Sequence, residues 1–257
     1  MNETDVTLDK YSFCLTCNIN RCKYLTNCFK SIGLTPPRIF PGVHHPYSGQ
    51  EGCKLGHIGM IMMARCLGLP YIVVFEDDAY PRPDACEKFN ECVEDLNRID
   101  PDWGMLVIGR TGEISCWDGI VDEFWVKYQT EQERNSLKSK VSIISDNIIS
   151  IPKNPTGSHA IVIRKNCYNE WIHSLLRNRY SDIALGQNNF TKNRIYWTRE
   201  ILFCQKQIDR KCMTYLADKK DGEDLYLYPY NYNLDFSGTA SIFSDPPKGF
   251  VRELVKK

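Results

Sequence analysis

The sequence lacks any uninterrupted apolar run long enough to span a bilayer, and it lacks an excess of charge of either sign. Its 32 basic and 32 acidic residues give a formal net charge of zero, which argues against nucleic acid or an anionic membrane as the main partner. Residues 1–5 are acidic and polar, unlike a secretory signal. We therefore expect a cytoplasmic protein with no integral membrane segment and no nucleic-acid partner.

Glycine-rich phosphate loops are also missing. No G-x-G-x-x-G or Walker-type stretch occurs, which disfavours a Rossmann dehydrogenase and a nucleotidyltransferase that depends on such a loop. There is no internal repeat and no low-complexity tract. With 257 residues, 42% of them apolar, the chain has the length and composition for one domain with a substantial core.

Cysteine, in contrast, is abundant, with 12 residues in the chain. Cys14, Cys17, Cys22 and Cys28 cluster early, but their spacing fits neither a standard zinc pattern nor a standard iron–sulfur pattern. A chain of this size does not need disulfides for stability. Mostly buried thiols are the favoured interpretation, with a disulfide or a bound metal as alternatives.

The pattern of apolar residues predicts alternating strands and helices, which is typical of an α/β protein with a mostly parallel central sheet flanked by helices. After Gly109 the alternation becomes irregular. The single domain is therefore expected to consist of a regularly alternating half, 8–110, and an irregular half, 111–257. The expected strands are 11–17, 38–40, 71–75, 105–108, 141–145, 148–151 and 160–163, and the expected helices are 21–32, 54–67, 167–176 and one that begins after Asp84.

The most informative segment is the apolar run 71–75, which leads directly into Glu76, Asp77 and Asp78. Such a run predicts a strand that is buried on both faces. Its carboxyl end lies at the edge where open α/β sheets bind ligands. Adjacent carboxylates repel one another, so a hard divalent cation shared with a phosphate is the favoured interpretation, and a solvated acidic turn is the alternative. If the chain stays extended, Glu76 and Asp78 share a face and Asp77 does not.

The helix expected at 54–67 has an apolar stripe formed by Leu55, Ile58, Met62 and Cys66. His57 projects roughly opposite that stripe in the first turn. We expect it to contact a nucleotide or phosphate, because helix starts favour anions, while a surface histidine without such a role is the alternative.

Two segments together resemble glycosyltransferase family 25. The run from Gly52 to His57, upstream of the strand that ends in Glu76, Asp77 and Asp78, is similar to the family's Gly-Cys-x-x-Ser-His segment and its Glu-Asp-Asp strand. The similarity extends over residues 10–185. Gly56 departs from the family's serine, and the arginine-rich stretch after the first strand is reduced to Arg21.

The resemblance implies a GT-A-type fold and a sugar transferase of the lipopolysaccharide- or collagen-modifying kind. Such enzymes move a sugar from a nucleotide-diphosphate donor, with UDP-galactose as one candidate, to a glycan or other hydroxyl acceptor, with inversion and with Mn²⁺ or Mg²⁺. It implies Asp78, with Glu76, as metal ligands, and Asp182 as the catalytic base, while His159 is the second candidate for that base. It also implies that 8–110 is the nucleotide-binding half and 111–257 the acceptor-side half. The expected nucleotide-binding residues are Asn18, Arg21, His57, Glu76 and Asp77.

A second class of function stays open: a non-catalytic module that binds a nucleotide or glycan on the same fold. Loss of the acidic ligands would favour that class, but Glu76, Asp77 and Asp78 are all present. For Arg21 and Asp182 the alternatives are a solvated residue in a helical turn and an ordinary turn or cap residue.

Overall fold

The computed structural model of the protein describes residues 6–17, 19–45, 49–111, 113–114, 120–121, 142–150, 156–178, 181–186 and 195–205. The strands are β1 (Ser12–Thr16), β2 (Arg38–Pro41), β3 (Tyr71–Glu76), β4 (Ala79–Pro81), β5 (Met105–Thr111), β6 (Glu113–Ile114), β7 (Ile120–Val121), β8 (Ser142–Ile143), β9 (Ile148–Ser150), β10 (Thr156–Arg164), β11 (Ile195–Thr198) and β12 (Phe203–Gln205). The helices are α1 (Ile19–Ser31), α2 (Gly49–Cys66), α3 (Ala85–Ile99), α6 (Tyr168–Arg177) and α7 (Ser181–Gly186), with a 3₁₀ turn at Lys165–Cys167.

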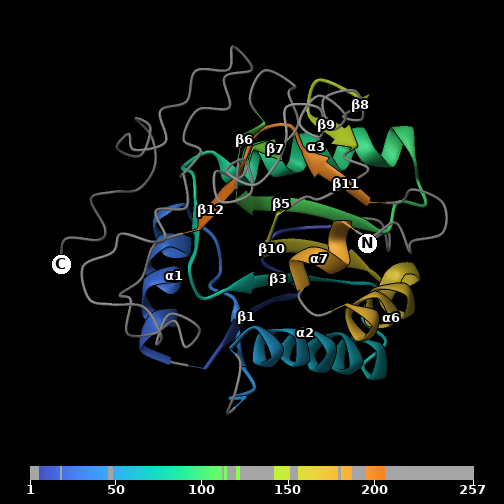
Figure 1. The fold of residues 1–257 in the computed structure, drawn as a ribbon. Coiled ribbons are helices and arrows are strands. Elements are labelled where there is room, and N and C mark those ends of the chain that lie inside the picture. The colour runs from blue at the N-terminus through green and yellow to red at the C-terminus, as the bar shows by residue number, and fades with distance from the viewer. Residues whose placement is uncertain are drawn as a thin grey trace.

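One large sheet organises the fold, and its strand order is β2-β1-β3-β10-β5-β11-β9-β8 (Figure 1). Strands β2, β1 and β3 are parallel to one another, as are β5 and β11, but β10 runs antiparallel between β3 and β5. Strand β9 is antiparallel to β11 and to β8. The sheet is therefore mixed, and the prediction of a mostly parallel sheet was wrong. Strands from both predicted halves of the chain lie in this one sheet.

Helices cover the two faces of the sheet. On one face, α2, α6 and α7 lie together and pack with alternate residues of β3, β5 and β10 into one apolar cluster (Figure 1). On the other face, α1 and α3 pack with the intervening residues of the same strands into a second cluster. The α/β class predicted from the sequence is confirmed. None of the described helices is both long enough and apolar enough to cross a membrane.

Strand β3 is the central element. Residues 71–75 are at most 1% exposed, because helices cover both faces of this part of the sheet. Ile72 and Val74 belong to the cluster that contains α2, α6 and α7, called here the α2 cluster. Val73 and Phe75 belong to the cluster that contains α1 and α3, called here the α3 cluster. The prediction of a strand buried on both faces is therefore confirmed.

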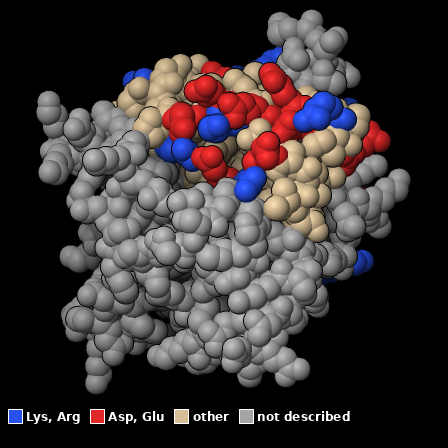
Figure 2. All heavy atoms as spheres, turned by 90° about the horizontal axis from the view of Figure 1, so that it is seen from above, with Lys and Arg blue, Asp and Glu red and all other residues tan. Residues whose placement is uncertain are grey.

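Helix α3 also matches its prediction. Its inward residues Phe89, Cys92, Val93 and Leu96 are all buried. The outward side carries charges, including the pairs Lys88–Glu91 and Arg98–Asp95, and Figure 2 shows acidic and basic side chains gathered on the side of the molecule where α3 lies in Figure 1. Asp84 precedes the first residue of α3, but its side chain makes no cap hydrogen bond and instead pairs with Arg82.

Helix α2 departs from its prediction in two respects. It begins at Gly49, ahead of the expected start at Lys54. Its inner face carries His57, Met60, Ile61 and Ala64, each 0% exposed. Of the predicted stripe, Leu55 and Met62 are 37% and 47% exposed, Cys66 is exposed, and only Ile58 is buried. The predicted orientation was wrong because it followed the largest apolar side chains, whereas the helix turns a histidine towards the sheet.

The nine cysteines whose side chains the structure describes are all thiols. Five of them are buried, namely Cys14, Cys22, Cys28, Cys92 and Cys167. Burial, followed by the charge of Asp95, raises the pKa of the Cys92 thiol to about 12. Among the nine described cysteines, none forms a disulfide and just over half are buried.

Candidate functional site

The acidic end of β3 lies where several elements meet. The strand ends at Glu76, and Asp77 and Asp78 form the turn that leads into β4. Parallel strand β1 ends beside it, with Leu15 in register with Glu76. Antiparallel strand β10 brings His159 to the same edge, because the next residue, Ala160, is in register with Phe75. The site is thus built from β1, β3, β10 and the first half of α2.

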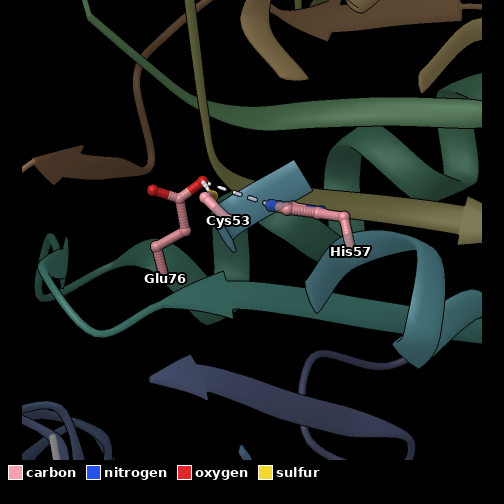
Figure 3. A group of neighbouring side chains, drawn as sticks. All are labelled: Cys53, His57 and Glu76. Atoms are coloured by element: carbon pink, nitrogen blue, oxygen red, sulfur yellow. Dashed lines mark hydrogen bonds and ion pairs between the residues drawn. The ribbon is translucent and has the colours of Figure 1, made fainter. Parts of the chain in front are cut away.

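Glu76 lies on the α2 side of the sheet. The Nε2 atom of His57 lies 3.2 Å from Glu76 Oε1, and the Sγ atom of Cys53 donates to the same oxygen at 3.6 Å (Figure 3). Cys53 and His57 are four residues apart on α2 and therefore face the same way. The His57 side chain is 0% exposed and that of Glu76 is 20% exposed, so the group is covered from the α2 side and reaches solvent at the carboxylate.

Asp77 points to the other side, where the hydroxyl of Thr16 donates a hydrogen bond to Asp77 Oδ2. Both side chains are buried. This division follows from the pleat of the strand, in which alternate side chains point to opposite faces. Glu76 continues the series Ile72 and Val74 on the α2 face, and Asp77 continues the series Val73 and Phe75 on the α3 face. The extension does not continue beyond Glu76, so the predicted sharing of a face by Glu76 and Asp78 does not follow from strand geometry.

Asp78 is 9% exposed and lies in the turn after the strand. The charges of Asp77 and Asp78 are close enough to β1 to act on the thiol of Cys14. A hydrogen bond with Cys22 is the largest cause that raises the pKa of Cys14, followed by burial and by these charges. The thiol of Cys14 therefore stays protonated.

His159 reaches the same edge from β10. It is 1% exposed, and its Nε2–H donates to the carbonyl of Phe203 at 2.9 Å. Burial lowers the pKa of His159 below its ordinary 6.5, while the Phe203 carbonyl and the charge of Glu76 act in the opposite direction. A Cβ atom at Gly109 would lie 2.6 Å from His159 Nε2, so glycine at this position leaves room for the ring.

The structure therefore brings together Glu76, Asp77, Asp78, His57 and His159. The expected position of His57 in a first helical turn was wrong, because α2 begins at Gly49, about two turns earlier. A direct effect of the helix start on a phosphate at His57 does not apply, since that effect is confined to the first turn.

Three other predicted residues are not placed in the site by the described residues. Asn18 lies outside them. The backbone of Arg21 lies in α1 and that of Asp182 in α7, but both side chains lie outside the described part of the structure.

Sequence reasoning missed Cys53 and Thr16. Cys53 could have been found from its spacing, because a residue four positions before His57 shares its helix face. Thr16 could have been found from its place at the end of a strand parallel to β3. Glycine at position 56 also has a local reason, because a Cβ atom there would lie 2.6 Å from Leu15 Cδ1 in the core.

A comparison of the chain with protein-family models found no match, and a comparison with curated proteins found no significant match either.

Proposed function

We propose that the protein is a metal-dependent glycosyltransferase that moves a sugar, with inversion, from a nucleotide-diphosphate donor to a glycan or other hydroxyl acceptor. One observation carries the proposal: a strand buried on both faces ends in Glu76, Asp77 and Asp78 at the carboxyl edge of the sheet. Open α/β sheets bind their ligands at this edge. The resemblance of the Gly52–His57 segment to glycosyltransferase family 25, with its GT-A fold, supports the same activity.

The resemblance implies that Asp78 is the main ligand for Mn²⁺ or Mg²⁺, and carboxylate oxygens suit these hard cations. Such a cation would act as a Lewis acid that neutralises the charge of the leaving diphosphate. Cys53 and His57 contact Glu76, and Thr16 contacts Asp77. Glu76 is the second candidate ligand, through its solvent-facing side.

The acceptor hydroxyl must lose a proton as the new glycosidic bond forms. Asp182 is the first candidate for this base, as the resemblance implies, and its helix α7 packs against β10. His159 is the second candidate. Its lowered pKa keeps the ring neutral at pH 7, as a base requires, but its burial makes a role in shaping the site the better supported one.

The test is the thermal stability of the full chain against a panel of nucleoside diphosphates, UDP included, each with and without Mn²⁺. A ligand at 100 times its Kd adds about 2.7 kcal/mol to the free energy of unfolding. For a chain of this size, that corresponds to a rise in Tm of roughly 5–10 °C. A rise that requires both metal and nucleotide, and that is lost in Asp78→Ala, is the expected result.

Asp146→Asn is the control variant, because this carboxylate is fully exposed and its ion pair with Arg199 has a separation of 3.7 Å. The control should retain the whole shift. A shift with nucleotide alone that survives Asp78→Ala would favour a non-catalytic nucleotide-binding module. No shift with any nucleotide would overturn the transferase proposal.

A further inference from the structure

Three side chains of different chemistry converge beside the acidic turn. Cys53 and His57 come from α2, and Glu76 comes from the end of β3 (Figure 3). One ligand atom from each residue, the Cys53 sulfur, a His57 ring nitrogen and a Glu76 oxygen, lies within 4.8 Å of the other two. Thiolate, imidazole and carboxylate are the donors that zinc takes in proteins.

The distances suit a shared cation. Zinc bonds of about 2.0–2.3 Å in a tetrahedral arrangement separate the ligand atoms by about 3.3–3.6 Å. His57 Nε2 lies 3.2 Å from Glu76 Oε1, and Cys53 Sγ lies 3.6 Å from the same oxygen. Two of the three edges of a ligand triangle therefore already have the required length. Hydrogen bonds among these side chains have similar lengths, but only a metal bound to Cys53 would give a thiolate-to-metal charge-transfer band.

The surroundings also suit a cation. Spacing of four residues on one helix lets Cys53 and His57 chelate from a rigid element, and Glu76 approaches from a buried strand. His57 is 0% exposed, while the 20% exposure of the Glu76 side chain leaves one side open to solvent. Three protein ligands with one open position are the usual arrangement of zinc sites that also bind water or a ligand.

We propose that Cys53, His57 and Glu76 form a binding site for a zinc-class divalent cation. On binding, the Cys53 thiol releases its proton to the solvent and the sulfur bonds to the metal as a thiolate. A sulfur ligand favours Zn²⁺ over Mn²⁺ or Mg²⁺, so this site differs in chemistry from the one proposed at Asp78, although Glu76 is a candidate ligand in both. The proposal goes beyond the transferase activity and does not depend on it.

Such an ion would neutralise Glu76 and tie α2 to the end of β3. Because Asp77 and Asp78 directly follow Glu76, fixing the position of Glu76 would also restrict the motion of the acidic turn.

The experiment uses the full chain after removal of metal with a chelator and exchange into buffer with reductant. Co²⁺ is the spectroscopic probe, and Zn²⁺ competes with it. We expect one equivalent of Co²⁺ to produce a thiolate-to-cobalt charge-transfer band and the visible bands of tetrahedral cobalt, and Zn²⁺ to displace both.

Cys53→Ser should abolish the charge-transfer band and weaken Zn²⁺ binding at least about 100-fold, since loss of an outer-shell partner alone typically costs 10- to 100-fold. Glu76→Gln should weaken binding as well. Cys66→Ser is the matched control, because this thiol is on the same helix but exposed, and it should leave the band unchanged. Asp78→Asn should also keep the band, which separates failure of this proposal from failure of the transferase proposal.

Absence of the band in the wild type, or its persistence in Cys53→Ser, would overturn the proposal. X-ray absorption of the zinc-loaded wild type gives a second test that needs no variant. One sulfur at about 2.3 Å with nitrogen and oxygen at about 2.0 Å is expected. A shell without sulfur, or with several sulfurs, would contradict the site.

Discussion

Helices α2 and α3 pack on opposite faces of the same sheet, and they differ in what they bury. Helix α3 buries apolar side chains such as Phe89 and Leu96 and exposes charges. Helix α2 buries His57, whereas Leu55 and Met62 are 37% and 47% exposed. Apolar burial alone explains α3. It does not explain α2, because a helix that maximised apolar burial would not place a histidine inside and a leucine outside.

The difference shows which helix serves the site. Turning His57 inward places a polar group in the core, and such a group is costly there unless it is hydrogen-bonded or coordinates a metal. Glu76 supplies that contact at 3.2 Å. Helix α2 is thus oriented by the acidic end of β3 as well as by packing, and α3 by packing.

The comparison predicts the largest effect in the core of α3. Phe89→Ala should lower the free energy of unfolding by about 3–5 kcal/mol, because it leaves a cavity in a well-packed core. Leu55→Ala on α2 should cost less than about 1 kcal/mol, since this leucine is partly exposed. Urea unfolding of both variants measures this. An equal loss of stability in the two variants would mean that Leu55 is buried, as the apolar stripe in the sequence predicted, and would contradict the orientation of α2.

Two glycines of α2 provide the next test. A Cβ atom at Gly52 would lie 2.2 Å from the backbone oxygen of Val43, so Gly52→Ala should destabilise the protein by about 1–3 kcal/mol. At Gly59 the nearest atom, in Phe40, would lie 3.6 Å away, so Gly59→Ala should stabilise it by about 0.5–1 kcal/mol through helix propensity. Thermal and urea unfolding should show opposite signs. The same sign for both would contradict the close approach of α2 to the Val43 loop.

The response to pH should also differ between the two sides. The folded state lowers the pKa of His159 below 6.5, mainly through burial. The unfolded chain then binds more protons in this range, so stability falls as the pH drops below about 6.5, by at most about 1.4 kcal/mol per pH unit. His159→Gln should flatten the dependence of the free energy of unfolding on pH between 5 and 7.

On the α3 side, the group to compare is Asp95. Burial tends to raise its pKa, but hydrogen bonds from Ser145, Arg98 and Asn147 outweigh burial and lower the pKa below 3.8. The stability that Asp95 contributes is therefore present above about pH 4 and is lost as the pH falls below it. Asp95→Asn should lower the free energy of unfolding by a nearly constant amount above about pH 4 and should flatten its pH dependence only below that pH. An altered pH dependence near neutral pH in Asp95→Asn, or an unaltered one there in His159→Gln, would contradict the assignment.

The smallest effect is expected on the exposed side of α3. Arg98 is 72% exposed and pairs with Asp95 at 2.6 Å. Surface pairs three residues apart contribute little, so Arg98→Ala should cost no more than about 0.5 kcal/mol and the cost should shrink in high salt. Urea unfolding at low and high salt measures it. A loss above 1 kcal/mol would show that the charged face of α3 matters for its packing.

Much of the fold could be predicted from local pattern. The apolar run of β3, the periodic face of α3 and the stop at Gly33, whose φ is +75°, are all properties of neighbouring residues. The reversed strand β10 could not be predicted in this way. The apolar run 160–163 suits a parallel and an antiparallel strand equally well. The direction of β10 is set by its pairing with β3 and β5, whose residues lie far from it in the chain.

The candidate site divides similarly. The sequence identified the acidic end of β3, and it marked His57 as a residue that packing alone did not explain. It did not reveal that the side chains of Cys53, His57 and Glu76 converge, or that Thr16 donates a hydrogen bond to Asp77. These contacts depend on how β1, β3 and α2 pack against one another.

The sequence by itself determined the class of fold, the buried central strand and the position of the acidic residues at its end, because apolar periodicity and the order of elements are local. Only the tertiary structure decided which face of α2 turns inward, which acid each neighbour engages and where β10 enters the sheet. These choices depend on competition among long-range contacts. In α2, the inner face combines a contact between His57 and Glu76 with burial of Met60, Ile61 and Ala64, and it leaves Leu55 and Met62 partly exposed.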